Sequence, residues 1–506
     1  MTPSDKEAAS PLERGLGPFD ATMIVMGSMI GSGIFIVSAD VARLVGSPGW
    51  LLAAWGLAGL LTVTGAICSA EVAAMMPKAG GQYVFLRTAF GPSVGFLFGW
   101  STFLVVGTGT IAAVAVAFAK FLGVFLPSIS ASNHLIEPIR LGSSYALTFT
   151  SQQAVAVALI VFLSVVNTRG LRTGSRIQNV FTFAKTAALI GLIVVGIAFG
   201  RSAAAAWWTS DWWNPAANGW TVDQAQPGLP GFLGGIAFAL VLGKALIGPL
   251  FSQTAWNTVT FTGGEIRDPG RTLPLALVVG CTTVVGLYML ANVAYLVTLP
   301  LDAIRTADQD RVGTATMTAV LGEAGTWIMA GCILVSTFGC VNGLVLACAR
   351  VYYAMAGDGL FFSAAGKTNR NHVPAAAIIM QCVWACLLAL PVTVKTDPAT
   401  QAVAFGNLYG QLLDYIIPVD LLFYTLMVAA VFVLRRRLPD AERPYKTLGY
   451  PVTPALYIAL AALLILDFIY LSPEVSGIGF LIALSGLPVY AVWSRLGARG
   501  RSATSG

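Results

Sequence analysis

The stretch GSMIGSG, at residues 27–33, lies in the middle of the first long apolar segment of the chain. A membrane helix gains from Leu or Ile at such positions, and three glycines in seven residues weaken it. Another long apolar segment, at residues 229–262, is interrupted by Gly248-Pro249 and then by the polar run SQTAWN at 252–257. Glycine in membrane helices often serves packing alone. Two interrupted segments nevertheless predict two discontinuous helices.

The composition is typical of a membrane protein. The 506 residues are 56% hydrophobic and only 10% charged, with a mean hydropathy of +0.77. Soluble domains carry about a quarter charged residues, so a soluble enzyme is excluded. The basic residues are too dispersed for a nucleic-acid surface. All seven cysteines lie inside apolar runs, which argues against disulfides and metal sites. We expect no cofactor and no metal.

Twelve apolar segments are long enough to be membrane spans. They are expected at residues 20–44, 49–75, 93–125, 151–167, 178–200, 229–262, 274–299, 325–353, 374–394, 404–434, 451–471 and 476–495. An even number places both termini on one side. With that side in the cytoplasm, twenty of the 29 Lys and Arg residues fall in cytoplasmic loops and six in outer loops, as the positive-inside rule requires. We therefore expect an integral protein of the plasma membrane, or bacterial inner membrane, with cytoplasmic termini.

The two interrupted segments are the first and sixth spans. Because they are five spans apart, spans 1–5 and 6–10 would have opposite orientations, which is the inverted-repeat pattern of secondary transporters. The predicted fold class is an all-α polytopic membrane protein with 12 transmembrane helices, a 5+5 inverted repeat and discontinuous helices 1 and 6. The expected divisions are a tail at 1–19, a first repeat at 20–200, a second repeat at 229–434, two spans at 451–495 and a tail at 496–506.

A break in a membrane helix frees main-chain groups that can bind a ligand. The second half-helix begins with free N–H groups and a partial positive charge, which suit a carboxylate. The first half-helix ends with free carbonyls, which suit an ammonium group. Gly31 and Gly33 let a ligand approach the backbone, and Ser32 adds a hydroxyl. A zwitterion matches both ends, so the residues predict α-amino acids as substrates.

Several motifs resemble the amino acid–polyamine–organocation (APC) superfamily, and in particular its L-type amino acid transporter branch. They are GSMIGSGIF at 27–35, AWN at 255–257, GEIRDP at 264–269, LPLA at 273–276, STFGCVNG at 336–343, GIGF at 477–480 and LSGLPVY at 484–490. The motifs keep the family's order, and the resemblance runs from residue 16 to 495. It implies the APC fold and sodium-independent amino acid transport, commonly by exchange.

The resemblance also assigns roles at both breaks. Ser32 and Gly33 would donate N–H groups to the substrate carboxylate. The carbonyls of Met29, Phe251 and Thr254 would receive the substrate amine, and Phe251 would be the gating aromatic. Further substrate-binding residues implied by the resemblance are Ile30, Gly31, Ser252, Trp256 and Asn257. Ordinary helix packing remains the alternative for these residues.

Lys185 lies about seven residues into the fifth span, roughly 10 Å along the helix. An ammonium group at that depth is usually functional, although a lysine that reaches the cytoplasmic interface is the alternative. The resemblance places here a lysine whose charge replaces the sodium ion of related transporters and which bonds the unwound first helix. We therefore predict that transport does not need sodium.

The chain departs from the resembling branch in the sixth span. Thr254 and Ala255 stand where two glycines are usual, and Gln253 stands where an aromatic is common. The added volume predicts small neutral substrates. Asp420, in the tenth span, falls where the family has a polar substrate-facing residue. A proton acceptor, a partner for a cationic side chain and an interhelical hydrogen bond all remain open for it.

Sodium-independent exchange of small neutral L-amino acids by alternating access is the predicted function. A proton-coupled or cationic amino acid transporter that uses Asp420 is the second hypothesis. A membrane enzyme is disfavoured because the two histidines, His134 and His372, fall on opposite sides, and a sensor would need an output domain. In the resembling branch, light chains often join a heavy chain through a cysteine in the outer loop between spans 3 and 4. That loop, at 126–150, has no cysteine here, so we expect a bacterial-type chain without a disulfide-linked heavy chain. The expected partners are the amino acid substrate and membrane lipid.

Overall fold

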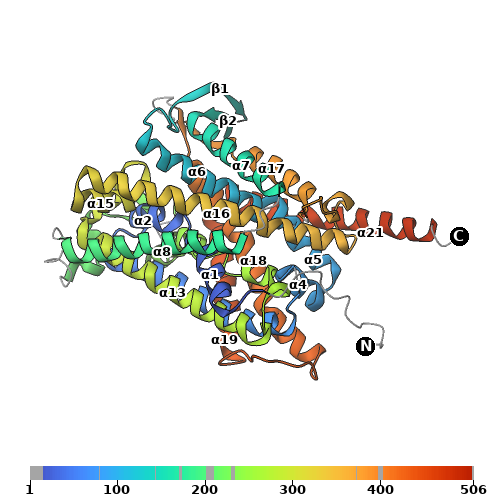
Figure 1. The fold of residues 1–506 in the computed structure, drawn as a ribbon. Coiled ribbons are helices and arrows are strands. Elements are labelled where there is room, and N and C mark those ends of the chain that lie inside the picture. The colour runs from blue at the N-terminus through green and yellow to red at the C-terminus, as the bar shows by residue number, and fades with distance from the viewer. Residues whose placement is uncertain are drawn as a thin grey trace.

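The computed structural model describes residues 15–78, 80–142, 144–169, 174–200, 210–229, 234–371, 373–396 and 403–503. Most of the predicted N-terminal tail, His372 and the last three residues of the predicted C-terminal tail lie outside these ranges. Within them the chain is mostly helical, and the long helices form one bundle (Figure 1). α15 (Val312–Leu321) and α4 (Gln82–Phe90) lie at opposite ends of this bundle. We call these ends the α15 end and the α4 end.

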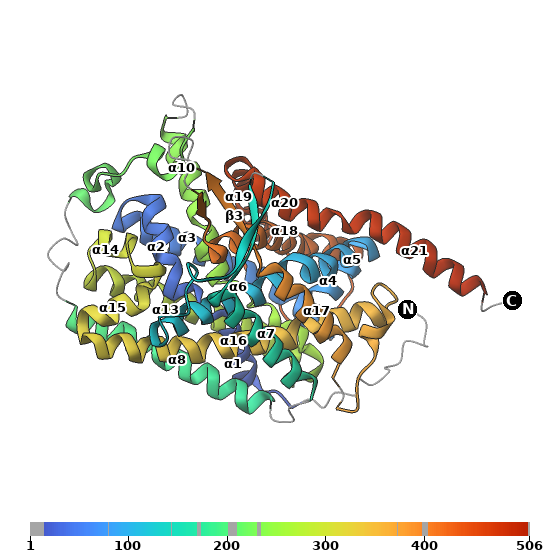
Figure 2. The ribbon, with the colours of Figure 1, turned by 90° about the horizontal axis from the view of Figure 1, so that it is seen from above.

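Ten helical segments of the described chain are long and apolar enough to span a membrane. A bent pair, α1 (Pro18–Met29) with α2 (Gly33–Val45), makes an eleventh. The ten are α3 (Pro48–Met75), α5 (Pro92–Ser101) with a π-helical turn (Thr102–Val106) and α6 (Gly107–Phe125), α7 (Ser151–Thr168), α8 (Gly174–Phe199), α10 (Gly234–Ala245) with α11 (Ile247–Ser252), α13 (Pro269–Thr298), α16 (Glu323–Gly357), α18 (Leu408–Arg437), α19 (Val452–Leu471), and α20 (Pro473–Leu484) with α21 (Gly486–Ala503). These eleven lie close to predicted spans. α21 extends beyond the bundle (Figure 2).

The predicted ninth span, at residues 374–394, is shorter than expected. α17 (Ala375–Leu388) has 14 residues, or about 21 Å of helix, whereas a hydrocarbon core is about 30 Å thick. Residues 391–396 form a strand instead, because Pro391 cannot continue the helix and the sequence that follows it is β-branched. The total of twelve spans therefore stays a prediction.

A small sheet, which hydropathy did not predict, joins two distant connections. Its antiparallel strands lie in the order β1 (His134–Leu141), β2 (Tyr145–Thr150), β3 (Pro391–Thr396) and β4 (Val403–Phe405). Ala146 of β2 stands opposite Val392 of β3. The sheet thus ties the connection before α7 to the connection before α18.

Glycines bring the interrupted helices close to their neighbours. α1 packs against α8 and α13, and α2 packs against α11. A Cβ atom built at Gly280 of α13 would lie 2.7 Å from Val25 of α1, and one built at Gly33 would lie 2.1 Å from Ser252 Oγ. Only glycine permits such approaches. The two broken helices are therefore in direct contact in the middle of the bundle.

Candidate functional site

The first break separates α1 from α2, whose axes differ by 43°. Ile30 ends α1 in an extended conformation, with φ −74° and ψ 92°. The helix resumes at Gly33, and the N–H groups of its first turn have no partner within the helix. The break thus presents main-chain donors at the start of α2, inside the protein.

The second break lies between α11 and α12 (Thr258–Phe261). Ala255, within this break, has a φ of 65°, which residues other than glycine rarely adopt. Such strained positions cost about 1–3 kcal/mol and cluster at functional sites. The Ala255 carbonyl accepts hydrogen bonds from the main chain and hydroxyl of Thr258, at 3.2 and 2.7 Å. The turn is therefore held by the next half-helix.

A small cavity of about 20 Å³ lies between the two breaks. We call it the first cavity. It brings together seven of the predicted substrate-binding residues, namely Met29, Gly31, Ser32, Gly33, Phe251, Ser252 and Thr254. Thr110 and Val114 of α6 and Cys340 and Leu344 of α16 also line it. This volume holds about one water molecule, so an amino acid enters only when side chains around the cavity move.

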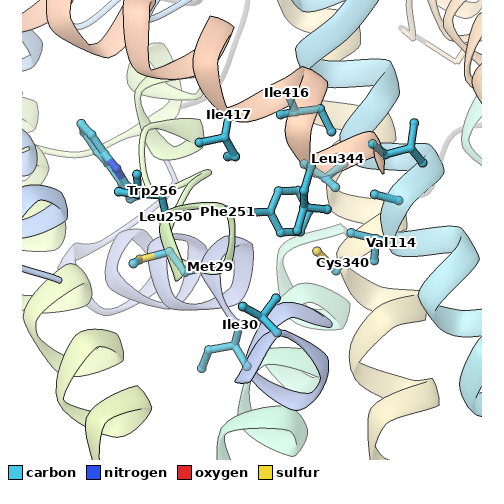
Figure 3. Packing of buried hydrophobic residues seen from close by; sticks show 14 of the residues in the cluster. Met29, Ile30, Val114, Leu250, Phe251, Trp256, Cys340, Leu344, Ile416 and Ile417 are labelled. Carbon is cyan, nitrogen blue, oxygen red and sulfur yellow. The ribbon is translucent and has the colours of Figure 1, made fainter. Parts of the chain in front are cut away.

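Phe251 is an aromatic side chain that lines the first cavity. Figure 3 shows its ring pointing toward Val114, Cys340 and Leu344, while Trp256 points the other way. The Phe251 ring packs edge-on against Tyr409, with ring centroids 6.0 Å apart. Tyr409, at the start of α18, was not among the predicted site residues.

A second cavity, also of about 20 Å³, lies on the other side of the α11–α12 break. It takes in two predicted residues that the first cavity does not contain, Trp256 and Asp420, and Thr254 lines both cavities. Trp256 stacks on Tyr424, with ring centroids 4.9 Å apart. The structure therefore separates Asp420 from the N–H groups of the first break.

Two predicted residues, Ile30 and Asn257, line neither small cavity. Asn257 donates a hydrogen bond to Gln82 of α4 at 2.5 Å and accepts one from the Tyr424 hydroxyl at 3.1 Å. Its side chain links α4 and α18. Ile30 is fully buried, and its carbonyl faces the Ser336 hydroxyl at 3.5 Å.

A wide cavity of about 830 Å³ leads from the protein surface toward the first cavity. Exposed residues such as Asp40 and Glu474 line it, and Tyr409 lines it from α18. The Tyr409 hydroxyl lies 3.1 Å from Ser32 Oγ. Tyr409 and Phe251 therefore stand between the wide cavity and the first cavity.

Asp310 contacts several charged and polar groups close to Tyr409. Its carboxylate lies 2.9 Å from the Arg43 guanidinium and 3.6 Å from Lys120 Nζ, and it accepts a hydrogen bond from Asn407 at 3.0 Å. Lys120 Nζ also lies 5.9 Å from the centre of the Tyr409 ring. The cluster thus joins α2, α6 and α18, next to the aromatic pair.

Contacts at the α4 end close the opposite side. Leu16 pairs with Ile266 as an isolated parallel bridge. Arg350 of α16 lies 3.2 Å from the Glu265 carboxylate, just beyond α12. The wide cavity therefore approaches the two breaks from one side of the bundle, whereas these contacts close the other side.

Lys185 holds the end of α1. Its side chain is 1% exposed, and its Nζ donates a hydrogen bond to the carbonyl of Gly27. Two tyrosines of α13 act beside it: Tyr288 donates to the Met29 carbonyl at 2.9 Å and Tyr295 to the Ile34 carbonyl at 3.1 Å. Neither tyrosine was among the predicted site residues. Their spacing of seven residues, which places both on one helix face, is the signal that was present.

Two of the three carbonyls predicted to receive an amine, those of Met29 and Phe251, already have donors. Met29 accepts from Tyr288, and the Phe251 carbonyl accepts from both the N–H and the hydroxyl of Thr254, at 3.2 and 2.8 Å. A carbonyl oxygen has two acceptor positions. Met29 therefore keeps one free position in this conformation, whereas Phe251 gains one only if Thr254 turns away.

Comparisons with known proteins agree with this geometry. Residues 16–493 match the family described as amino acid permease. Large neutral amino acids transporter small subunit 2 of Mus musculus is 29% identical, over 95% of this chain and 81% of its own. Serine/threonine exchanger SteT of Bacillus subtilis (strain 168) is 28% identical, over 95% and 96%. The b(0,+)-type amino acid transporter 1 of Homo sapiens is 27% identical, over 96% and 89%.

These findings confirm the predicted superfamily and the L-type branch, and they confirm a transporter rather than an enzyme. Its many apolar helices make it an integral membrane protein. The chain belongs to the amino acid permease family.

Proposed function

We propose that this protein exchanges small neutral L-amino acids across the membrane, without sodium, by alternating access. The observation that carries the proposal is the first cavity, which meets main-chain donors at the start of α2 and main-chain acceptors at the end of α1. The N–H groups of Ser32 and Gly33 bind the substrate carboxylate at the positive end of α2. The carbonyls of Met29 and, after rearrangement, Phe251 and Thr254 receive its amine.

Lys185 supports the absence of sodium coupling. Its buried ammonium supplies a fixed positive charge and a hydrogen bond to Gly27 at the end of α1. A cation so placed makes a bound sodium ion at the same point unfavourable by like-charge repulsion. The conformation of the first break then depends on the protein's own charge rather than on an ion from solution.

The orientation follows from the distribution of basic residues. With both termini in the cytoplasm of a plasma-membrane protein, the α15 end and the wide cavity face outward. An external amino acid then passes Tyr409 and Phe251 to reach the first cavity. Opening to the cytoplasm requires α1 and α12 to part from their neighbours, which breaks the Leu16–Ile266 and Arg350–Glu265 contacts.

The chain organisation and its partners are part of the proposal. The two inverted repeats occupy residues 20–200 and 229–434, with two added spans at 451–495. The outer loop at 126–150 carries the β1–β2 hairpin and no cysteine. We infer a bacterial-type transporter that works without a disulfide-linked heavy chain, in contact with lipid and substrate.

Size selectivity provides the first test. Thr254 lines the first cavity, and Ala255 beside it is strained by its positive φ. In the wild type, alanine and serine are expected to compete for labelled alanine uptake at least tenfold better than tryptophan. The double variant Thr254→Gly/Ala255→Gly removes side-chain volume and relieves the strain, so tryptophan competition should improve about tenfold.

The competition is measured in proteoliposomes, as the concentration of each amino acid that halves labelled alanine uptake. Val279→Ala on α13, an exposed position, serves as a matched loss of volume outside the site, and its preference should stay as in the wild type. Wild-type uptake that tryptophan inhibits as well as alanine does would contradict the proposed selectivity.

A further inference from the structure

The second cavity contains a buried carboxylate without a partner. Asp420 is 7% exposed and lines this cavity. Within the ranges that the structure describes, no Lys or Arg pairs with it and no side chain donates a hydrogen bond to it. The buried carboxylate of Glu71, by contrast, accepts two hydrogen bonds from Arg435, at 2.8 and 2.7 Å. Buried charges are normally paired, so a partner for Asp420 is expected to come from a ligand.

A neighbouring acceptor in the same cavity is also free. Gln253 is 1% exposed, and its amide nitrogen donates to the Trp55 carbonyl at 3.4 Å. Its Oε1 atom is buried without a hydrogen-bond donor among the described residues. The hydroxyl-bearing residues Thr62 and Tyr457 line the cavity as well. One carboxylate and one free amide oxygen form a set of acceptors, which suits an ammonium group with its three donors.

The second cavity adjoins the first through one residue. Thr254 lines both, and the two cavities are each of about 20 Å³. A substrate held by its carboxylate at the start of α2 has its side chain beside the α11–α12 break. A short side chain that passes Thr254 reaches the acceptors around Asp420. Because both cavities must widen to admit a substrate, a short side chain requires the least movement of the lining residues.

We propose that the second cavity binds the terminal ammonium group of a short diamino acid, whose α-carboxylate and α-amine occupy the first cavity. This inference rests on the proposed function, because it uses the same site for the α-groups. It extends the substrate class from small neutral amino acids to small amino acids with a second amine. The Asp420 carboxylate supplies the counter-charge, and Gln253 accepts a hydrogen bond from the same group.

The test compares two competitors with the same carbon skeleton. The chain is reconstituted into proteoliposomes that exchange labelled alanine. Unlabelled 2,4-diaminobutyrate or 2-aminobutyrate is added as the competitor. The readout is the ratio of the two half-inhibitory concentrations within each variant, which cancels any change in overall activity. The wild type should prefer 2,4-diaminobutyrate. Asp420→Asn should shift the ratio against it by about 30-fold or more, as expected when a buried charge pair loses one member.

Two further variants sharpen the comparison. Gln253→Met removes the second acceptor and should shift the ratio in the same direction, by about tenfold. Asp467→Asn is the matched control. Asp467 of α19 is 8% exposed, its oxygens have no hydrogen-bond partner among the residues that the structure describes, and it lines neither small cavity. Its ratio should stay within about twofold of the wild type.

Two results would overturn the inference. Wild-type alanine exchange that 2,4-diaminobutyrate does not inhibit would do so while leaving the proposed function intact. So would an unchanged ratio in Asp420→Asn. An unchanged ratio, together with alanine exchange that depends on pH in the wild type but not in Asp420→Asn, would assign Asp420 to a proton instead, alongside the Tyr424, Tyr457 and Cys348 groups around it. Absence of alanine exchange in the wild type would instead contradict the proposed function.

Discussion

Gly33→Ala is expected to reduce amino acid exchange by about 100-fold or more. A Cβ atom at this position would lie 2.1 Å from Ser252 Oγ, 2.8 Å from Ser252 Cβ and 3.0 Å from its Cα. A serine hydroxyl can rotate, but the backbone of α11 cannot give way without moving the whole half-helix. Such a shift separates the two breaks that form the first cavity. Displacements of about 1 Å at a binding site commonly cost about 100-fold in activity.

The measurement is the initial rate of labelled alanine exchange per reconstituted protein. Gly286→Ala on α13 is the matched control, because no heavy atom lies within 4 Å of its added methyl group. It should stay within about twofold of the wild type. Adding Ser252→Gly to Gly33→Ala removes the two nearest atoms and should recover about tenfold. A Gly33→Ala protein with wild-type exchange would show that the contact between α2 and α11 does not shape the site.

Lys185→Met is expected to abolish exchange, with a loss of about 100-fold or more, while the protein stays folded. Methionine keeps most of the length and volume of the side chain but cannot donate to the Gly27 carbonyl. The end of α1 then loses its charged hydrogen bond, of a kind that contributes about 1.5–3 kcal/mol. Because the variant also removes a buried charge and its desolvation cost, we expect little change in thermal stability.

Thermal unfolding of the Lys185→Met protein is measured on the detergent-purified sample. Exchange is then measured after the same sample has been reconstituted into vesicles. Lys244→Met is the matched control: this lysine of α10 donates to Gln226 at 2.7 Å and is only half-buried. Its exchange should stay within about threefold of the wild type. Full activity of Lys185→Met in a sodium-free medium would disprove the role assigned to the charge.

Hydropathy predicted most of the fold because membrane spans are defined by apolar length, which a single sequence displays directly. The two breaks could also be predicted, because the glycines at 27–33 and the polar run at 252–257 destabilise an apolar membrane helix. The predicted ninth span is longer than α17 because Pro391 prevents the helix from continuing to the end of the apolar run. Strand pairing between residues 145–150 and 391–396 depends on tertiary contacts that no local pattern contains.

Only the part of the site that depends on neighbouring residues in the sequence could be predicted. Residues within one break stay together whatever the packing, so Gly31, Ser32 and Gly33 reach the first cavity as a group. The position of Asp420 depends on the rotation of α18 relative to α11, which spacing along the chain does not determine. It faces the second cavity instead. Tyr288 and Tyr409 became visible only because the structure shows which carbonyl and hydroxyl they meet.

Counterflow in proteoliposomes tests the central claim most directly. Vesicles loaded with unlabelled alanine are diluted into labelled alanine, with choline in place of sodium on both sides. We predict transient accumulation of label above its equilibrium level, driven by the internal amino acid, and none in vesicles loaded with buffer alone. Equal labelling of both vesicle populations, or accumulation that appears only when sodium is restored, would contradict sodium-independent exchange.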